Sequence, residues 1–410
     1  MQPVGLYVLR YTLIVAAIVA AFYSIVLTNA ARLFARDTAI SVPAAVHLVP
    51  YNGAYAARLA AWEPDKRDAL LQRAVQLNPF DAESLIQLGL LAEIQRDDPR
   101  TAERDYLRAA EVNKLFLPKW TLANFYFRRQ NAAEFFHWAS AALSITPYAS
   151  DPLFTQMWMM SQDADRLAQA IPDRPRILVQ YSFFLANRRQ FSAIPPIVQR
   201  LIRKVGSDDP RAWGRDDLIA AVEDHMLAAG DAHDALQVWA SLKEGRWLSQ
   251  SAPDADHPLT NGGFHIGFYK HGFDWVPVDC SGATLEQFAS EGEVRVSLSG
   301  NQPDHCVLLQ QYVPLEPGGA YSLQWKGEGH SMDAQSGLAW HLRSVPGDGL
   351  GREIVSGDLG AAPPKWEFNA PGDSSVALLS LDYARPLGQV RASGNFELRS
   401  AGLTLLQRAR

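Results

Sequence analysis

A spacing of about 34 residues between similar segments is the strongest constraint on what this chain can fold into. Two pairs of an alanine followed five residues later by a proline lie 68 residues apart, with a further alanine near the midpoint. A period near 34 is typical of stacked helical hairpins, because one hairpin cannot bury its apolar face alone. The positions are Ala74 with Pro79, Ala109, and Ala142 with Pro147.

Residues 81–110 show the pattern inside one repeat. Leu88 and Gly89 lie on one face of an expected first helix, and Ala102 and Tyr106 lie on one face of a second. This order of Leu-Gly, alanine, aromatic residue and closing proline resembles the tetratricopeptide repeat. The resemblance implies an α-solenoid that holds protein partners along one face.

The resemblance predicts an array over residues 32–247, although the number of repeats is open. Polar and aromatic residues near the starts of first helices are the candidate protein-binding residues. The alternative for each of them is a solvated position or a position packed between repeats. The candidates are Asn124, Tyr126 and Arg128.

The amino-terminal part of the chain contains a long uncharged stretch. Residues 11–31 carry no Asp, Glu, Lys or Arg, with Arg10 before the stretch and Arg32 and Arg36 after it. About 20 such residues span the hydrocarbon core of a bilayer. We predict a transmembrane anchor over residues 11–31 behind a tail of residues 1–10, with a cleaved secretory signal as the alternative. The flanking arginines are balanced, so they do not decide the orientation.

The period changes to two after residue 258. Of the 28 glycines, 21 lie beyond that position, and Val294, Val296 and Leu298 alternate with polar residues. Short alternating runs separated by Pro-Gly and Gly-Asp turns predict an antiparallel jelly-roll β-sandwich. We place it at residues 259–410, after a polar, proline-bounded linker at residues 248–258.

Three segments of this region resemble carbohydrate-binding modules of the galactose-binding-like type. The resemblance covers roughly 150 residues and implies the sandwich fold, with glycan binding as an expectation. The segments are Asn261-Gly262-Gly263-Phe264, Gly272-Phe273-Asp274-Trp275, and the run from Gln310 to Tyr321.

A sugar site needs an exposed aromatic platform with polar groups beside it, because the C–H faces of sugars stack on aromatic rings. The alternative for each tryptophan of a small sandwich is a place in the core. The candidates are Trp340 and Trp366 first, then Trp275, with His341 and Arg385 as polar neighbours.

The related modules often carry a glutamate directly after the Asn-Gly-x-Phe motif, at a structural calcium site. This chain has His265 there. Calcium prefers oxygen ligands, so we expect no cofactor and no metal.

The two cysteines of the chain, Cys280 and Cys306, both lie in the expected sandwich. A disulfide between them would stabilise the domain by roughly 3 kcal/mol. Two buried free thiols are the alternative. A disulfide would place the sandwich in an oxidising compartment, which favours the periplasmic side of an inner membrane.

Charge and motifs exclude several functions. Residues 258–410 hold 11 Lys and Arg against 16 Asp and Glu, a net charge of −5, which disfavours nucleic acid as a partner. No phosphate-binding, zinc-protease or serine-hydrolase motif occurs. We therefore expect a non-catalytic, membrane-anchored adaptor. An anchor followed by this domain pair resembles accessory proteins of bacterial exopolysaccharide assembly and export. A purely structural scaffold and a glycan-active enzyme are the alternatives.

Overall fold

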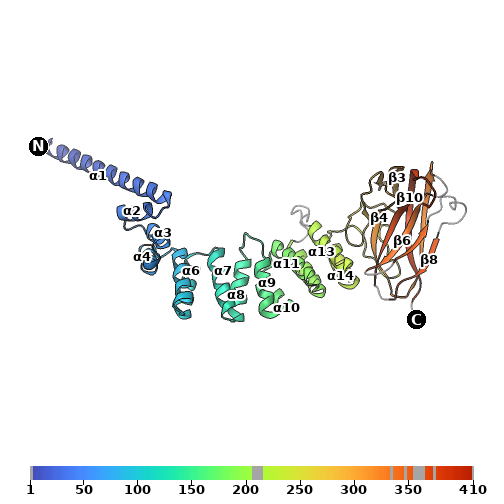
Figure 1. The fold of residues 1–410 in the computed structure, drawn as a ribbon, viewed down its shortest axis with the longest axis horizontal. Helices are drawn as coiled ribbons and strands as arrows, with labels where there is room; N and C mark the ends of the chain where they lie inside the picture. The colour runs from blue at the N-terminus through green and yellow to red at the C-terminus, as the bar shows by residue number, and fades with distance from the viewer. Residues whose placement is uncertain are drawn as a thin grey trace. The chain divides into compact units, whose positions relative to one another are not determined.

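A computed structural model describes residues 3–205, 216–332, 336–345, 349–353, 365–372 and 375–408. Helices come first along the chain and strands follow, as the blue-to-red colouring of Figure 1 shows. The order confirms the predicted fold class, a helical array followed by an antiparallel sandwich. The chain divides into two compact units, Met1–Gln162 and Asp163–Arg410. The boundary between the units thus lies inside the predicted array, and the last helices belong with the sandwich.

The first unit contains nine helices among its described residues. Asn or Asp caps several helices by accepting hydrogen bonds from backbone N–H groups of the first turn, as Asn52, Asp81 and Asp98 do. The helices are α1 (Pro3–Arg36), α2 (Ser41–Leu48), α3 (Gly53–Trp62), α4 (Arg67–Leu77), α5 (Ala82–Leu90), α6 (Pro99–Val112), α7 (Phe116–Arg128), α8 (Ala132–Leu143) and α9 (Asp151–Ser161), with a 3-10 turn at Pro64–Lys66 and a π-helical turn at Leu91–Gln95.

Small residues bring paired helices close together, as the repeat pattern predicts. Ala102 and Ala109 are fully buried on α6. Gly89 on α5 faces the ring of Tyr106 on α6 so closely that a Cβ atom there would lie 2.4 Å from the ring. The Tyr106 hydroxyl donates a hydrogen bond to Glu93 Oε2 at 2.9 Å. Glycine at position 89 is therefore a packing requirement of the α5–α6 pair.

Helix α1 is longer than the predicted anchor. Among the residues that the structure describes, it is the one helix long and apolar enough to cross a membrane, as either an anchor or a signal sequence. Its last third packs on α2 and α3: Ala30 is fully buried, and the rings of Phe34 and Tyr55 stack with centroids 4.6 Å apart. The end of α1 is therefore part of the array.

The second unit begins with helices and continues into the sandwich. Residues 248–258 have no regular secondary structure, as the composition of the predicted linker suggests. The helices of this unit are α10 (Ala164–Ala170), α11 (Pro175–Asn187), α12 (Ile194–Val205), α13 (Asp216–Ala228) and α14 (Ala232–Glu244), with a 3-10 turn at Phe191–Ala193.

Ten described strands form two five-stranded sheets in which all neighbouring strands are antiparallel. Sheet A has the order β1-β4-β9-β6-β7, and sheet B has the order β2-β3-β10-β5-β8. Chain neighbours such as β4 and β5 lie in different sheets, as in a jelly roll. The strands are β1 (Val276–Pro277), β2 (Ala283–Phe288), β3 (Glu293–Ser299), β4 (His305–Pro314), β5 (Ala320–His330), β6 (Leu338–Ser344), β7 (Gly349–Glu353), β8 (Lys365–Asn369), β9 (Val376–Ala384) and β10 (Ser393–Gln407).

The two sheets enclose a core rich in aromatic residues. The ring centroid of Trp340 lies 6.2 Å from that of Trp275 and 6.3 Å from that of Trp325, and all three side chains are buried. Cys280 and Cys306 form a disulfide beside this core, with Cα atoms 6.1 Å apart. The disulfide and the apolar helix α1 are consistent with a sandwich outside the cytoplasm.

The last helical hairpin packs directly on the loop before β1. Trp239 of α14 meets Phe273 edge to face, with centroids 5.8 Å apart, and its indole N–H donates to the carbonyl oxygen of Ser251. Glu223 of α13 is fully buried at this junction. Gly272 has φ of 59°, and a Cβ atom there would lie 2.8 Å from Glu223 Oε2. Helix and loop backbone therefore approach as closely as glycine allows.

Candidate functional site

The outward face of sheet A carries a group of polar residues in matching positions on neighbouring strands. Strand register places Gln310, Ser380 and His341 in one row, and Tyr312 and Arg343 in the next row. Cross-strand partners share a face, and the adjacent row, with Trp340 and Leu381, points into the core. We call the outward set the sheet A face; it consists of Gln310, Tyr312, His341, Arg343, Ser380 and Asp382.

The central strand of this face, β9, holds two polar side chains that are buried yet incompletely paired. Ser380 is 0% exposed and Asp382 is 5% exposed. Within the described part of the chain, Ser380 Oγ and Asp382 Oδ1 have no hydrogen-bond partner. The other carboxylate oxygen, Asp382 Oδ2, lies 3.5 Å from Nε2 of the exposed His305. An unpaired buried polar atom costs about 1–3 kcal/mol. Both atoms are closed to solvent, so they form a floor beneath the face and are not part of its open surface.

Tyr312 stands beside this floor and is half-buried. Burial raises the pKa of the Tyr312 phenol, the Asp224 carboxylate raises the pKa further, and Arg343 opposes them. Asp224 belongs to α13, where its Oδ2 lies 2.7 Å from His271 Nδ1 and its Oδ1 accepts a hydrogen bond from the backbone N–H of Gly272 at 2.6 Å. The end of α13 therefore contributes to the electrostatic surroundings of the sheet A face.

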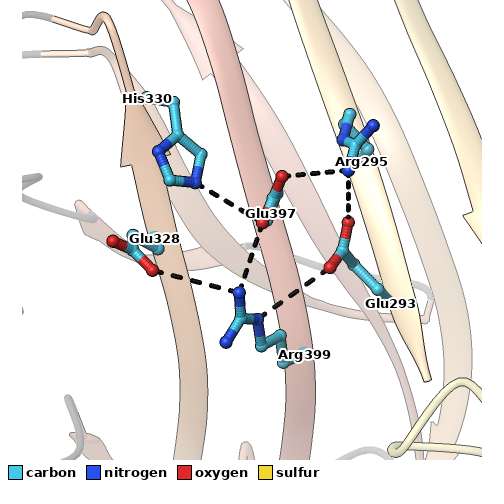
Figure 2. A network of polar contacts seen from close by, with 6 residues as sticks. All are labelled: Glu293, Arg295, Glu328, His330, Glu397 and Arg399. Carbon is cyan, nitrogen blue, oxygen red and sulfur yellow. Dashed lines mark hydrogen bonds and ion pairs between the residues drawn. The ribbon is translucent and has the colours of Figure 1, made fainter. Parts of the chain in front are cut away.

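The outward face of sheet B differs, because its charged groups are paired with one another. Figure 2 shows the network: Arg295 lies 3.0 Å from both Glu293 and Glu397, and Arg399 lies 3.4 Å from Glu397. His330 approaches the other side of Glu397, at 3.4 Å. The charged side chains of this face are paired with one another, so the face is a weaker candidate for a ligand site.

The pKa of Glu397 is lowered by this pairing. Partial burial would raise the pKa of the Glu397 carboxyl, but the hydrogen bond from Arg399 and the charges of Arg295 and His330 outweigh burial and lower it. Glu397 thus stays ionised as one member of a mixed-charge ladder, which is typical of a solvated sheet surface.

Two of the predicted sugar-binding tryptophans are in the core. Trp340 and Trp275 are 0% exposed and contact each other between the sheets, so the prediction that they stack on a sugar is wrong. Trp340 is buried because the pleat of β6 directs its side chain inward, and Trp275 is buried from the loop before β1. Trp366, on the edge strand β8, is partly exposed and packs on Phe368, with centroids 4.8 Å apart.

The predicted polar neighbours are separated from each other. His341 lies on the sheet A face, directly opposite Ser380. Arg385 follows the end of β9 and pairs with Asp304 at 2.9 Å. The structure therefore brings His341, but neither Trp366 nor Arg385, into the group around Ser380 and Asp382.

The predicted protein-binding residues hold the helices of the array together. Tyr126 is 4% exposed, and its hydroxyl donates to Glu103 Oε1 on α6 at 2.6 Å. The prediction that Tyr126 contacts a partner is wrong, because its ring fills the space between repeats. Asn124 accepts a hydrogen bond from Gln156 of α9, and Arg128 donates two to Glu93.

Exposed apolar side chains lie instead at two turns of the array. Leu115 is 69% exposed and Leu117 is 52% exposed at the α6–α7 turn, and Tyr148 is 63% exposed after α8. The rings of Phe116 and Tyr148 meet edge to face, with centroids 5.5 Å apart, which connects the two turns. We call Leu115, Leu117 and Tyr148 the apolar turn cluster.

His265 directly follows the Asn-Gly-x-Phe motif, at the position where the resemblance implies a calcium ligand. His265 packs against Gly292, where a Cβ atom would lie 2.3 Å from its ring. The Asn261 Oδ1 atom already accepts a hydrogen bond from the backbone N–H of Ile266. Among the described residues, no group of three or more His, Cys, Asp or Glu is placed to hold a metal ion.

Comparisons with known proteins give distant structural likenesses. The chain matches no protein-family model, and no curated protein is similar to it in sequence. A structure described as "CBM4 structure and function" aligns with 35% of this chain and 97% of its own, at 14% identity and a TM-score of 0.27. A structure of TmCBM61 in complex with β-1,4-galactotriose aligns with 37% of this chain and 99% of its own, at 17% identity and a TM-score of 0.24.

The helical part has likenesses of the same kind. YrrB, described as a TPR protein with an unusual peptide-binding site, aligns with 52% of this chain and 95% of its own, at 11% identity and a TM-score of 0.23. Likenesses at these TM-scores carry no argument about function. The fold assignment rests on the helix pairing and strand order of this chain.

Three residues of the sheet A face, Tyr312, Ser380 and Asp382, were missed by the sequence reasoning. Their signal was present as alternation: Tyr312 and Gln310 alternate with the buried Gln311 and Val313 along β4. Alternation alone does not say which set of residues faces the core. A search for tryptophans therefore selected inward positions.

Proposed function

We propose that the protein is a membrane-anchored, non-catalytic adaptor whose sandwich binds glycan on the sheet A face and whose helices bind a protein partner. The observation that carries the glycan proposal is the half-buried Tyr312 with the polar residues Gln310, His341 and Arg343 in two adjacent rows of the sheet A face.

The surrounding residues suit a sugar ring. The half-buried Tyr312 offers an aromatic edge or face for stacking. His341, Gln310 and Arg343 stand in the same two rows and supply hydrogen-bond donors and acceptors. The face therefore combines an apolar surface with several polar groups, as small-molecule sites do.

The proposal that the protein is not an enzyme is supported by its sequence, in which no phosphate-binding, zinc-protease or serine-hydrolase motif occurs. We further propose that the protein works in exopolysaccharide assembly or export, with both units on the periplasmic side of an inner membrane. In this proposal, protein partners bind the array at the apolar turn cluster.

Native affinity electrophoresis of the full chain in detergent micelles tests the glycan proposal. The gels contain one soluble neutral polysaccharide each: mixed-linkage β-glucan, β-galactan or hydroxyethylcellulose. We expect retardation in at least one gel, and roughly tenfold weaker retardation for Tyr312→Ala and His341→Ala, equivalent to about 1.4 kcal/mol. Arg399→Ala, on the sheet B face, is the matched control and should behave like the unchanged protein.

Equal retardation of the unchanged protein and the three variants would show that the glycan binds elsewhere than on the sheet A face. No retardation in any gel, with a glycan array also negative, would leave the second candidate, a purely structural scaffold. Release of reducing ends from a retarded polysaccharide would instead establish an enzyme.

A further inference from the structure

The segment that follows α1 contains no charged side chain. Residues 38–57, which form α2 and the first part of α3, include no Lys, Arg, Asp or Glu. The charged residues that bound this segment, Asp37 and Arg58, pair with each other, and the Trp62 indole N–H also donates to Asp37 at 3.1 Å. A stretch of this length without charge is unusual for an array surface in water.

The segment folds back along α1. Its middle forms a turn between α2 and α3, which we call the α2–α3 corner, residues 48–52. At this corner the Tyr51 hydroxyl donates a hydrogen bond to the Tyr23 hydroxyl of α1 at 2.9 Å. The corner therefore lies level with residue 23 of the membrane helix.

The position of Tyr23 in a bilayer follows from the charges of α1. Arg10 is the last charged residue before Arg32, so a span of about 20 residues that begins at Tyr11 ends at Ala30. Tyr23 lies seven residues before that end, a distance of about 10 Å along the helix. Moving the span toward the amino terminus would place Arg10 inside the hydrocarbon, which is costly.

The exposed side chains of the corner suit this depth. Leu48 is 38% exposed and Tyr51 is 52% exposed. Tyrosine favours the boundary between headgroups and acyl chains, and leucine favours the acyl side of it. Arg73 of α4 donates a hydrogen bond to the carbonyl oxygen of Pro50 at 3.1 Å, which places a guanidinium beside the corner, within reach of lipid phosphates.

We infer that the α2–α3 corner inserts into the headgroup boundary of the leaflet from which α1 emerges. This inference rests on the proposal that α1 is retained as a membrane anchor, and it goes beyond that proposal. The first hairpin of the array is then a second membrane contact, and no free linker separates the bilayer from the repeats. The charged pair Asp37–Arg58 lies on the water side of the boundary, about 10 Å beyond Ala30 along α1.

Depth-dependent fluorescence quenching tests the inference with the full chain in phosphatidylcholine–phosphatidylglycerol vesicles. Native Cys280 and Cys306 are bonded to each other, so a single introduced cysteine takes the environment-sensitive maleimide dye. Leu48→Cys and Tyr51→Cys report on the corner, and Phe22→Cys reports on the span. Ile94→Cys, in the same unit and 74% exposed, is the matched aqueous control.

Interfacial elements sit about 5–10 Å into the boundary, so we expect at least about twofold quenching at positions 48 and 51 by a shallow lipid nitroxide. Phe22→Cys should respond more to a deep nitroxide, and Ile94→Cys to neither.

Quenching of Phe22→Cys without quenching at positions 48 and 51 would overturn the inference and leave the anchor intact. Absence of quenching at Phe22→Cys would overturn the anchor and the inference together. Quenching of Ile94→Cys equal to that at the corner would also overturn the inference. It would show that the whole array adsorbs to the membrane and that the corner makes no specific contact.

Discussion

Replacing Glu223 by glutamine removes a carboxyl group that the second unit buries completely. Neither carboxyl oxygen has a hydrogen-bond partner among the described residues. Burial raises the pKa of Glu223 well above its usual value, and the neighbouring Asp224 charge raises it further. Glutamine has nearly the same shape and does not titrate, so Glu223→Gln isolates the effect of ionisation.

The direction of the pH dependence follows from the raised pKa. Between the unfolded pKa, near 4.5, and the higher folded pKa, the folded state binds more protons than the unfolded state. The stability of the unchanged protein is therefore fully present below about pH 4.5 and falls as pH rises toward the folded pKa.

The largest loss that this group can cause at pH 7 is set by the unfolded pKa alone. At pH 7, a carboxyl with a pKa of 4.5 is 2.5 pH units above that pKa. Protonating it costs about 1.4 kcal/mol for each unit, or about 3 kcal/mol in total. We expect Glu223→Gln to recover up to this amount at pH 7 and little at pH 4.5. At about 2–4 °C per kcal/mol, the melting temperature of the second unit should rise by up to about 10 °C at pH 7.

Differential scanning calorimetry of the full chain in detergent, at pH 4.5 and pH 7, measures the effect. Glu244→Gln, an exposed position on the adjacent helix α14, is the matched control and should change neither melting temperature. An increase of equal size at both pH values would refute the reasoning, because it would show that ionisation of Glu223 is not the cause. A lower melting temperature for Glu223→Gln at pH 7 would show that the carboxylate is stabilised by contacts that the structure does not contain.

Two further predictions concern packing and covalent structure. Replacing Cys280 and Cys306 by serine should lower the stability of the sandwich by roughly 3 kcal/mol, and a reducing agent should lower the melting temperature of the unchanged protein but not of the variant. Gly89→Ala should destabilise the first unit by about 1–3 kcal/mol, because the new Cβ would lie 2.4 Å from the Tyr106 ring; a Gly89→Ala variant that keeps the helical circular-dichroism melt unchanged would contradict this close packing.

The repeat period and the alternation were sufficient to predict the fold. Small residues at fixed spacing, such as Gly89, Ala102 and Ala109, can only serve close helix pairs, and all three are buried in the structure. The boundary between the two compact units could not be predicted from the repeat period or the alternation. It depends on contacts such as the one between Trp239 and Phe273, which join residues on opposite sides of a polar segment.

The candidate site was predicted less well, because residue type was given more weight than orientation. Trp340 and His341 are adjacent on β6 and therefore point to opposite faces, so both could not belong to one site. Tyr126 and Arg128 were selected for their chemistry, yet their polar groups bond Glu103 and Glu93. Those partners lie 23 and 35 residues away in sequence, and only the stacking of repeats brings them together.

The junction between α13 and the sandwich connects the last helical hairpin to the proposed glycan face. Adjacent residues of α13 serve different purposes: Glu223 is buried against Gly272, while Asp224 holds His271 and raises the pKa of Tyr312. Any displacement of α13 from the sandwich would therefore expose a buried carboxyl and change the charge beside the glycan face at once. Within the second unit, the sheet A face and the last helical hairpin are thus joined in a single structure.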